Sequence, residues 1–190
     1  GFAFHRFSKQ QREQLYLDVT AGLDFLANQE SVDSQRLAIF AEEISADSAV
    51  LGASGDQRVR ALVLLSGRLT EKAKDTIASN DQIAILAMVS SDDRAGFRDM
   101  TDAYKLSNNA ASDIHVYKGL GVATAMFSTW RYNRPQEKPL DYVMAEWLTT
   151  RLNALGSSQE VSFTTEDGWT ISADLVSGES DSRSPAVILV

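Results

Sequence analysis

The chain has 190 residues, of which 44% are hydrophobic and 23% charged, and this suits a soluble globular protein with one domain and a buried core, or with one domain and part of another. Its formal net charge of -8 and the lack of a basic stripe argue against binding to nucleic acid, which requires clustered lysine and arginine. Without cysteine, the chain has no disulfide, thiolate nucleophile or cysteine-based metal site. No apolar run approaches the roughly 18 residues of a membrane span. None of these features assigns a cellular compartment.

The first part of the chain is predicted to be mainly helical. Residues 1–9 are rich in aromatic side chains but lack periodicity and the pattern of a signal peptide, so we expect an ordered loop there. A helix is predicted over residues 9–29, where Ser8 and Gln11 have the spacing of a capping box. Gly22 lies inside this helical pattern and weakens it. A turn is predicted at residues 31–34.

A short buried strand that runs directly into a helix is the pattern on which the rest of the interpretation depends. The apolar run from Leu37 to Ala41 has the length of a buried strand, and helical spacing of apolar residues begins after Ser45. An abrupt turn from strand to helix is where many α/β enzymes place a nucleophile or a phosphate-binding loop. Glu43 occupies this turn.

Strands and helices alternate through the middle of the chain. Further strands are predicted at residues 58–67, 83–89 and 113–117, and helices at 70–79, 95–107 and 139–155. The strands are almost continuously apolar, which is typical of a parallel sheet that is covered on both faces. This rhythm therefore predicts an α/β fold, with a mostly parallel sheet and right-handed connections through helices on both faces.

The pattern changes after Gly156. Two alternating runs, at residues 161–165 and 169–175, flank Asp167-Gly168 and predict an antiparallel β-hairpin. A polar loop then leads through Pro185 into a last buried strand, residues 186–190.

Together these patterns resemble the α/β-hydrolase superfamily, in its dienelactone hydrolase-like and serine aminopeptidase-like branches. The turn of that family reads Gly-x-Ser-x-Gly, and the same frame here reads Ala41-Glu42-Glu43-Ile44-Ser45. The resemblance covers roughly residues 8–155, as the C-terminal half of such a fold. The hairpin and last strand are similar to the strands that open an α/β-hydrolase domain.

The resemblance implies two units, residues 1–156 and residues 157–190. The second unit is either the start of a following copy in a tandem protein or part of a permuted or excerpted chain. In the family the third strand lies beside the strand that carries the nucleophile, so residues 186–190 could pair with the strand at 37–41. The strand that normally lies between the second and third strands of the family is absent from this sequence, and its absence would leave sheet edges unpaired. We therefore favour the tandem or excerpt over a self-sufficient permuted domain.

The resemblance also assigns three site positions, and two of them have lost their chemistry. Glu43 stands at the nucleophile position, and Asp93 at that of the acid, with Asp92 as a one-residue alternative. The base loop of the family reads Gly-x-Gly-His-Gly, and here Val122 replaces the histidine. Serine hydrolysis needs a nucleophile, a base and a group that orients the base. We therefore expect a catalytically degenerate domain with no intact catalytic residue.

Other catalytic assignments are weaker. His115 lies within a predicted strand and is expected to face the surface or a neighbour, and nothing fixes His5 near a cleft. A covalent ester on Glu43 would lack a base to activate water. Ser45 is expected to cap the following helix, Ser48 to lie one turn inside it, and neither has a visible base.

No metal or cofactor is expected. Carboxylates that could gather at the carboxyl edge of the sheet would suit Ca²⁺ or Mg²⁺, but no calcium-loop spacing is present, so a solvated acidic edge is the preferred interpretation. These carboxylates are Glu42, Glu43, Asp47, Asp92 and Asp93. Gly119-Leu120-Gly121 lacks the third glycine and the position of a dinucleotide fingerprint.

The expected function is a structural, interaction or ligand-binding role within a larger protein. The expected partner is an adjoining α/β-hydrolase domain or a second copy of the chain. The alternative is that this chain belongs to an active serine hydrolase, an esterase, dienelactone hydrolase-like enzyme or peptidase, whose catalytic residues lie in another copy or outside this chain.

Overall fold

A computed structural model describes residues 8–152, 156–164, 170–178 and 183–189. The helices are α1 (Lys9–Glu13), α2 (Tyr16–Ala27), α3 (Ser45–Ala53), α4 (Glu71–Ala78), α5 (Arg94–Leu106), α6 (Ala125–Asn133) and α7 (Leu140–Leu152). The strands are β1 (Val32–Glu42), β2 (Val59–Leu65), β3 (Ala84–Ser90), β4 (Asp113–Tyr117), β5 (Gly156–Thr164), β6 (Thr170–Gly178) and β7 (Ser184–Leu189). No described helix is both long and apolar enough to cross a membrane.

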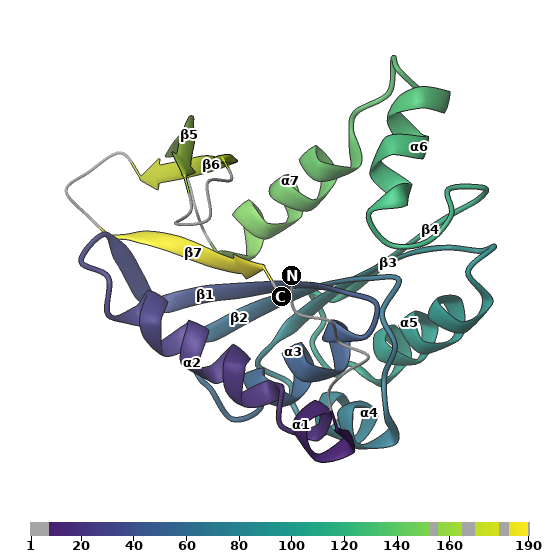
Figure 1. Cartoon of the computed structure of the whole chain (residues 1–190), viewed down its shortest axis with the longest axis horizontal. Coiled ribbons are helices and arrows are strands. Elements are labelled where there is room, and N and C mark those ends of the chain that lie inside the picture. Colours follow the sequence, from purple (N-terminus) through teal and green to yellow (C-terminus); the bar gives the residue numbers. More distant parts are fainter. Residues whose placement is uncertain (1–7, 153–155, 165–169, 179–182, 190) are drawn as a thin grey trace.

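Five strands form an all-parallel sheet in the order β4-β3-β2-β1-β7 (Figure 1). Val63 of β2, for example, pairs with Phe40 of β1 on one side and with Leu86 of β3 on the other. The predicted parallel sheet is therefore confirmed. Strands β5 and β6 pair antiparallel as a separate two-stranded sheet, and the turn predicted between them lies outside the described residues.

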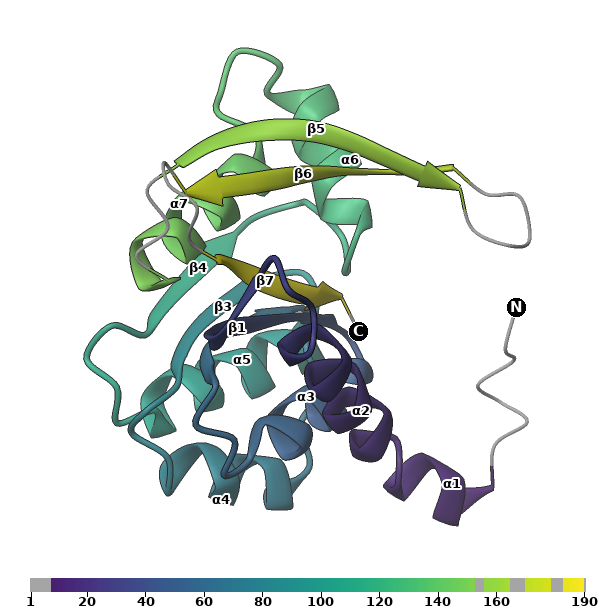
Figure 2. The same cartoon turned by 90° about the vertical axis from the view of Figure 1, so that its left-hand side faces the viewer.

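Helices cover both faces of the parallel sheet, as predicted. α2, α3, α4 and α5 lie on one face, and α6 and α7 lie on the other (Figures 1 and 2). Every residue of β3 is buried, and in β2 only Arg60 is exposed. The continuous apolarity of these strands follows from this arrangement, since both rows of side chains meet a helical layer.

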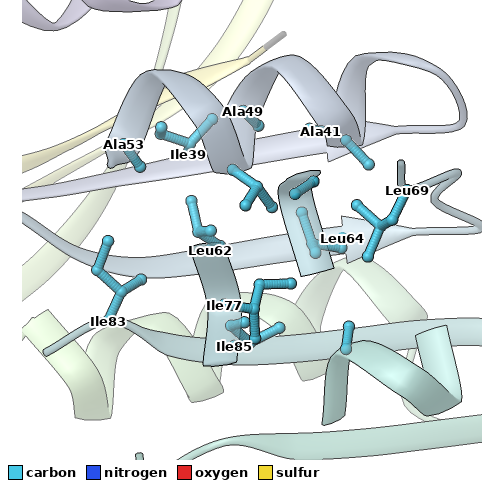
Figure 3. Packing of buried hydrophobic residues seen from close by; sticks show 14 of the residues in the cluster. Ile39, Ala41, Ala49, Ala53, Leu62, Leu64, Leu69, Ile77, Ile83 and Ile85 are labelled. Atoms are coloured by element: carbon cyan, nitrogen blue, oxygen red, sulfur yellow. The ribbon is translucent and has the colours of Figure 1, made fainter. Parts of the chain in front are cut away.

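The core on the first face consists of branched side chains from the sheet and small or branched side chains from the helices. Figure 3 shows Ile39, Leu62 and Leu64 of neighbouring strands close to Ala49 and Ala53 of α3, with Ile77, Ile83, Ile85 and Leu69 around them. The second face packs the sheet against Leu120, Met126, Trp130, Leu140, Trp147 and Leu152. Alanines in α3 allow this helix to lie close to the sheet.

The N-terminal helical region differs from the prediction of one helix over residues 9–29. The backbone N–H groups of Gln14, Leu15 and Leu17 donate to carbonyls only three residues earlier, and this tighter winding separates α1 from α2. The capping box at Ser8 is confirmed: Gln11 N donates to Ser8 Oγ at 3.2 Å, and Ser8 N donates to Gln11 Oε1 at 2.8 Å.

The turn predicted at residues 31–34 is wrong, because β1 already begins at Val32. The cause is β7, which is distant in sequence. Val32 pairs with Ser184, and the Ser184 N–H donates to the Ser31 carbonyl at 2.9 Å. Local turn residues are thus drawn into the sheet by a strand that arrives about 150 residues later.

β7 lies beside β1, where the resemblance places the third strand of the family. The two strands run parallel, with pairs from Leu37 and Ala186 to Phe40 and Leu189. The pairing of the last strand with the strand before the turn, which the sequence left as one possibility, is therefore present. The division of the chain after residue 156 stays a prediction.

Gly22 of α2 makes room for β7. A Cβ added at Gly22 would overlap the Cδ1 atom of Ile188 but would make only ordinary contact, at 3.7 Å, with its Cγ1 atom. The glycine that interrupts the helical pattern is thus explained by the close approach of the last strand.

We expect Gly22→Ala and Ile188→Val to compensate for one another. Alone, Gly22→Ala forces the Ile188 side chain aside and loses the roughly 1 kcal/mol that alanine otherwise gains in a helix. Ile188→Val removes the overlapping methyl group, so urea unfolding of the four variants should give a coupling of about 1 kcal/mol. Val187 points to the opposite sheet face, so Gly22→Ala and Val187→Ala should be additive. Additivity of Gly22→Ala with Ile188→Val would show that β7 does not pack on α2.

Candidate functional site

The strand-to-helix turn between β1 and α3 has a strained backbone. Glu43 has a φ angle of 46°, in the left-handed region that non-glycine residues rarely occupy. Its backbone is held from both sides, because Glu43 N donates to the Leu65 carbonyl at 3.0 Å and Arg68 N donates to the Glu43 carbonyl at 2.8 Å. The Glu43 side chain is exposed and makes no hydrogen bond or ion pair with a described residue. The sharp turn predicted from the sequence is thus present, with a carboxylate at its apex.

Ser45 does not cap α3 as predicted. Ile44 is the capping residue, and no side chain there accepts a hydrogen bond. Instead, the Ser45 hydroxyl donates to the Glu42 carbonyl at 2.7 Å and accepts from Glu42 N at 3.2 Å. Ser45 therefore closes the turn back onto the end of β1. Ser48 lies inside the helix, as predicted.

The loop that contains Val122 crosses the carboxyl ends of the central strands. Its Thr124 N–H donates to Glu42 Oε2 at 3.1 Å, next to the turn. Its Ala123 N–H donates at 3.0 Å to the hydroxyl of Ser66, a buried residue just after β2. Val122 itself is exposed and its side chain carries no polar atom. Val122, to which the resemblance assigns the role of the base, therefore lies in a loop beside the turn and has an aliphatic side chain.

Asp92, rather than Asp93, contacts this loop. Asp92 accepts from Gly119 N at 2.9 Å and from Gly121 N at 3.1 Å, and it also accepts from the Ser90 hydroxyl. The Ser90 hydroxyl in particular, together with the two glycine amides, lowers the pKa of Asp92 below its ordinary value, against the opposing effect of desolvation. Its carboxylate is thus ionised and already occupied by backbone donors.

The contacts of Asp93, the acid assigned by the resemblance, stabilise the start of α5 and an ion pair with Arg68. Asp93 begins α5 and accepts from Gly96 N at 3.1 Å. Its two carboxylate oxygens also accept from the Arg68 guanidinium, at 2.9 Å and 3.3 Å. A Cβ at Gly96 would lie 2.6 Å from Arg68 Nη1, so glycine is needed for the close approach. Of the two carboxylates, Asp92, the one-residue alternative, is therefore the one that contacts the loop of Val122.

The histidines and the remaining carboxylates form no further site among the residues that the structure describes. His115 lies on the edge strand β4 and contacts Asp113 and Tyr117, each at 3.2 Å, which confirms the expectation of a neighbour-facing histidine. His5 lies outside the described residues. Asp47 accepts from both the amide and the hydroxyl of Thr70 at 2.7 Å, away from Asp92. No group of three or more described His, Asp or Glu side chains is arranged to hold a metal ion.

A cavity that the sequence gave no reason to expect opens beside the turn. Its volume is about 420 Å³, and Leu15, Ile44 and Leu69 form its apolar walls. Ser48 and Arg68 add polar groups. These residues come from α1–α2, α3 and the segment after β2, so no local sequence pattern connects them. We call this space the elbow cavity.

A second, smaller cavity of about 360 Å³ lies on the opposite side of the sheet. Phe40, Phe127, Met144 and Leu189 line it, so it is mainly apolar and lies between the ends of β1 and β7 and the helices α6 and α7.

Comparison of the chain with protein-family models and with curated proteins found no match.

Replacing the strained residue should reveal the cost of the turn. Glycine adopts positive φ without penalty, so Glu43→Gly should raise the free energy of unfolding by about 1 kcal/mol. Glu43→Ala removes the same side chain but keeps the strain, so its stability should stay near that of the parent. Urea unfolding of both variants measures the difference, and equal stabilities would show that Glu43 is unstrained.

Proposed function

We propose that this chain is a catalytically degenerate α/β-hydrolase-like domain with a structural, interaction or ligand-binding role within a larger protein. The observation that carries the proposal is the turn between a buried parallel strand and a helix, where Glu43 has a left-handed backbone conformation. Such a strained turn exposes the nucleophile in α/β-hydrolases. Here it exposes a carboxylate that has no proton-accepting partner among the residues that the structure describes.

The surroundings of Glu43 support loss of catalysis. The neighbouring loop presents Val122, which can neither accept nor donate a proton. Asp92 is close to that loop, but its oxygens bind backbone amides and Ser90 rather than an imidazole. An acid that orients no base cannot activate a nucleophile or a water molecule.

The position of β7 supports the finer fold assignment, an α/β-hydrolase type of sheet. The resemblance puts the third strand of an opening half beside the strand of the nucleophile, and β7 pairs with β1 in this way. The two antiparallel strands that precede β7 also follow the order of that opening half.

The first test is the hydrolysis of p-nitrophenyl acetate. The chain should produce p-nitrophenol no faster than buffer does, and a fluorophosphonate probe should label no serine. Turnover that Glu43→Gln abolishes would overturn the proposal, because it would show a working carboxylate nucleophile. Labelling at Ser45 or Ser48 would overturn it by showing an activated serine.

The second test restores the missing groups. Glu43→Ser combined with Val122→His should hydrolyse the ester at least about tenfold faster than either single variant, because general base catalysis typically contributes a hundredfold or more. Adding Asp92→Asn should remove most of this gain, whereas adding Asp93→Asn should not if Asp92 is the orienting acid. A double variant no faster than the single ones would argue against the assigned positions.

A second candidate function is membership of an active serine hydrolase whose catalytic residues lie in another copy or outside this chain. The order β5, β6, β7 favours it, because it resembles the opening of such a domain. The partner would then be an adjoining α/β-hydrolase domain or a second copy. Fluorophosphonate labelling of the natural full-length protein, with the label located outside these residues, distinguishes this candidate from a protein without any active copy.

A further inference from the structure

The elbow cavity has the dimensions and lining of a small-molecule site. Ligand pockets in proteins span roughly 300–1,000 Å³ and are mostly apolar with a few polar groups. The elbow cavity holds about 420 Å³, and its apolar walls, Leu15, Ile44 and Leu69, are joined by polar and charged side chains that include Ser48 and Arg68. It therefore has room for a compact molecule with an apolar body.

Ser48 supplies a polar group that no described residue satisfies. The residue is 8% exposed and lines the cavity, and its hydroxyl makes no hydrogen bond with a described residue. Serines inside helices commonly donate to the carbonyl four residues earlier, but Ser48 makes no such bond. The Ser48 oxygen is not among the buried polar atoms that lack a partner, so it is reached from the cavity, where a ligand group can replace water as its partner.

The charged side chains around the cavity are of both signs and balance one another. The lining contains two positive side chains, Arg12 and Arg68, and two negative ones, Glu13 and Asp47, so its formal charges sum to zero. Arg68 also contacts Asp93, and Asp47 accepts from the amide and hydroxyl of Thr70. No excess of positive or negative charge therefore attracts an ion, and the lining favours an uncharged ligand.

We propose that the elbow cavity binds an uncharged small molecule that has an aryl or alkyl body and one carbonyl or hydroxyl group, which hydrogen-bonds to Ser48. The proposal names a ligand class for the ligand-binding role proposed above and rests on that role. It is tested by binding and not by turnover, so its failure would leave the proposed loss of catalysis unaffected.

The probe is 6-propionyl-2-(dimethylamino)naphthalene, an uncharged fluorophore whose emission shifts to the blue in apolar surroundings. Titration with the chain should give a saturable blue shift. Ile44→Trp fills the cavity from α3, and Leu15→Trp fills it from the opposite wall, so each should abolish the shift. Leu17→Trp is the matched control, because Leu17 is as exposed as Ile44, at 50% against 49%, and does not line the cavity.

The contribution of Ser48 is measured with Ser48→Ala and with 2-(dimethylamino)naphthalene, which lacks the carbonyl group. Ser48→Ala should weaken binding of the carbonyl probe roughly three- to tenfold, as expected for one neutral hydrogen bond, and leave binding of the analogue without a carbonyl group unchanged. Absence of saturable binding, or binding that both cavity-filling variants retain although they fold, overturns the site. Equal affinity of Ser48→Ala for the carbonyl probe overturns the assigned ligand class.

Discussion

Leu64→Ala and Leu65→Ala should each lower the free energy of unfolding by about 2–5 kcal/mol. Both side chains are fully buried, but they lie on opposite faces of β2: Leu64 packs in the core under α3, and Leu65 packs in the core under α6 and α7. Truncation leaves a cavity in either place. Such a loss is a large part of the 5–15 kcal/mol that stabilises a typical domain.

Urea unfolding followed by circular dichroism measures both variants. Tyr132→Ala, at a residue that is 87% exposed, is the control and should change stability by less than about 0.5 kcal/mol. A large cost for Leu64→Ala together with a small cost for Leu65→Ala would contradict the covering of the second face by α6 and α7.

Asp93→Ala should cost about 2–4 kcal/mol, because it removes two different functions of one buried carboxylate. The Gly96 N–H at the start of α5 loses its acceptor, and Arg68 loses its ion-pair partner. Asp93→Asn keeps an oxygen for Gly96 but removes the charge, so it should cost about half as much.

The two substitutions separate the capping role of Asp93 from the ion pair in denaturant unfolding. Arg68→Met completes the comparison: it leaves the Asp93 charge, whose side chain is almost fully buried, without its partner, and it should also be destabilising. Asp93→Ala at no cost would mean that the acid is not part of the structure of α5. Asp93 would then again be a candidate for the orienting acid that the resemblance assigns to it.

The parallel sheet and the turn at Glu43 were predictable because both depend on local patterns. Apolar runs between helical segments fixed the positions of β2, β3 and β4 to within two residues. The resemblance located Glu43 at the turn from the frame around it. These features need no information about distant parts of the chain.

Several features that depend on distant contacts were missed. The early start of β1 at Val32 depends on Ser184, and the role of Gly22 depends on Ile188. That Asp92, and not Asp93, accepts from Gly119 and Gly121 was also not predictable, because only folding shows which carboxylate reaches these amides. The elbow cavity has no sequence signature, because Ser48 and Leu15 become neighbours only when α3 packs beside the N-terminal helices.

The late position of β7 in the chain also sets an order for folding. Strands β1 to β4 pair through helices that follow one another along the chain, whereas β7 must close a segment of about 150 residues to reach β1. Contacts of such long sequence separation form slowly, because the chain entropy is lost before the contact is gained. During synthesis on the ribosome, β1 therefore emerges long before β7. Until β7 pairs with it, the free edge of β1 could accept a strand from another nascent chain.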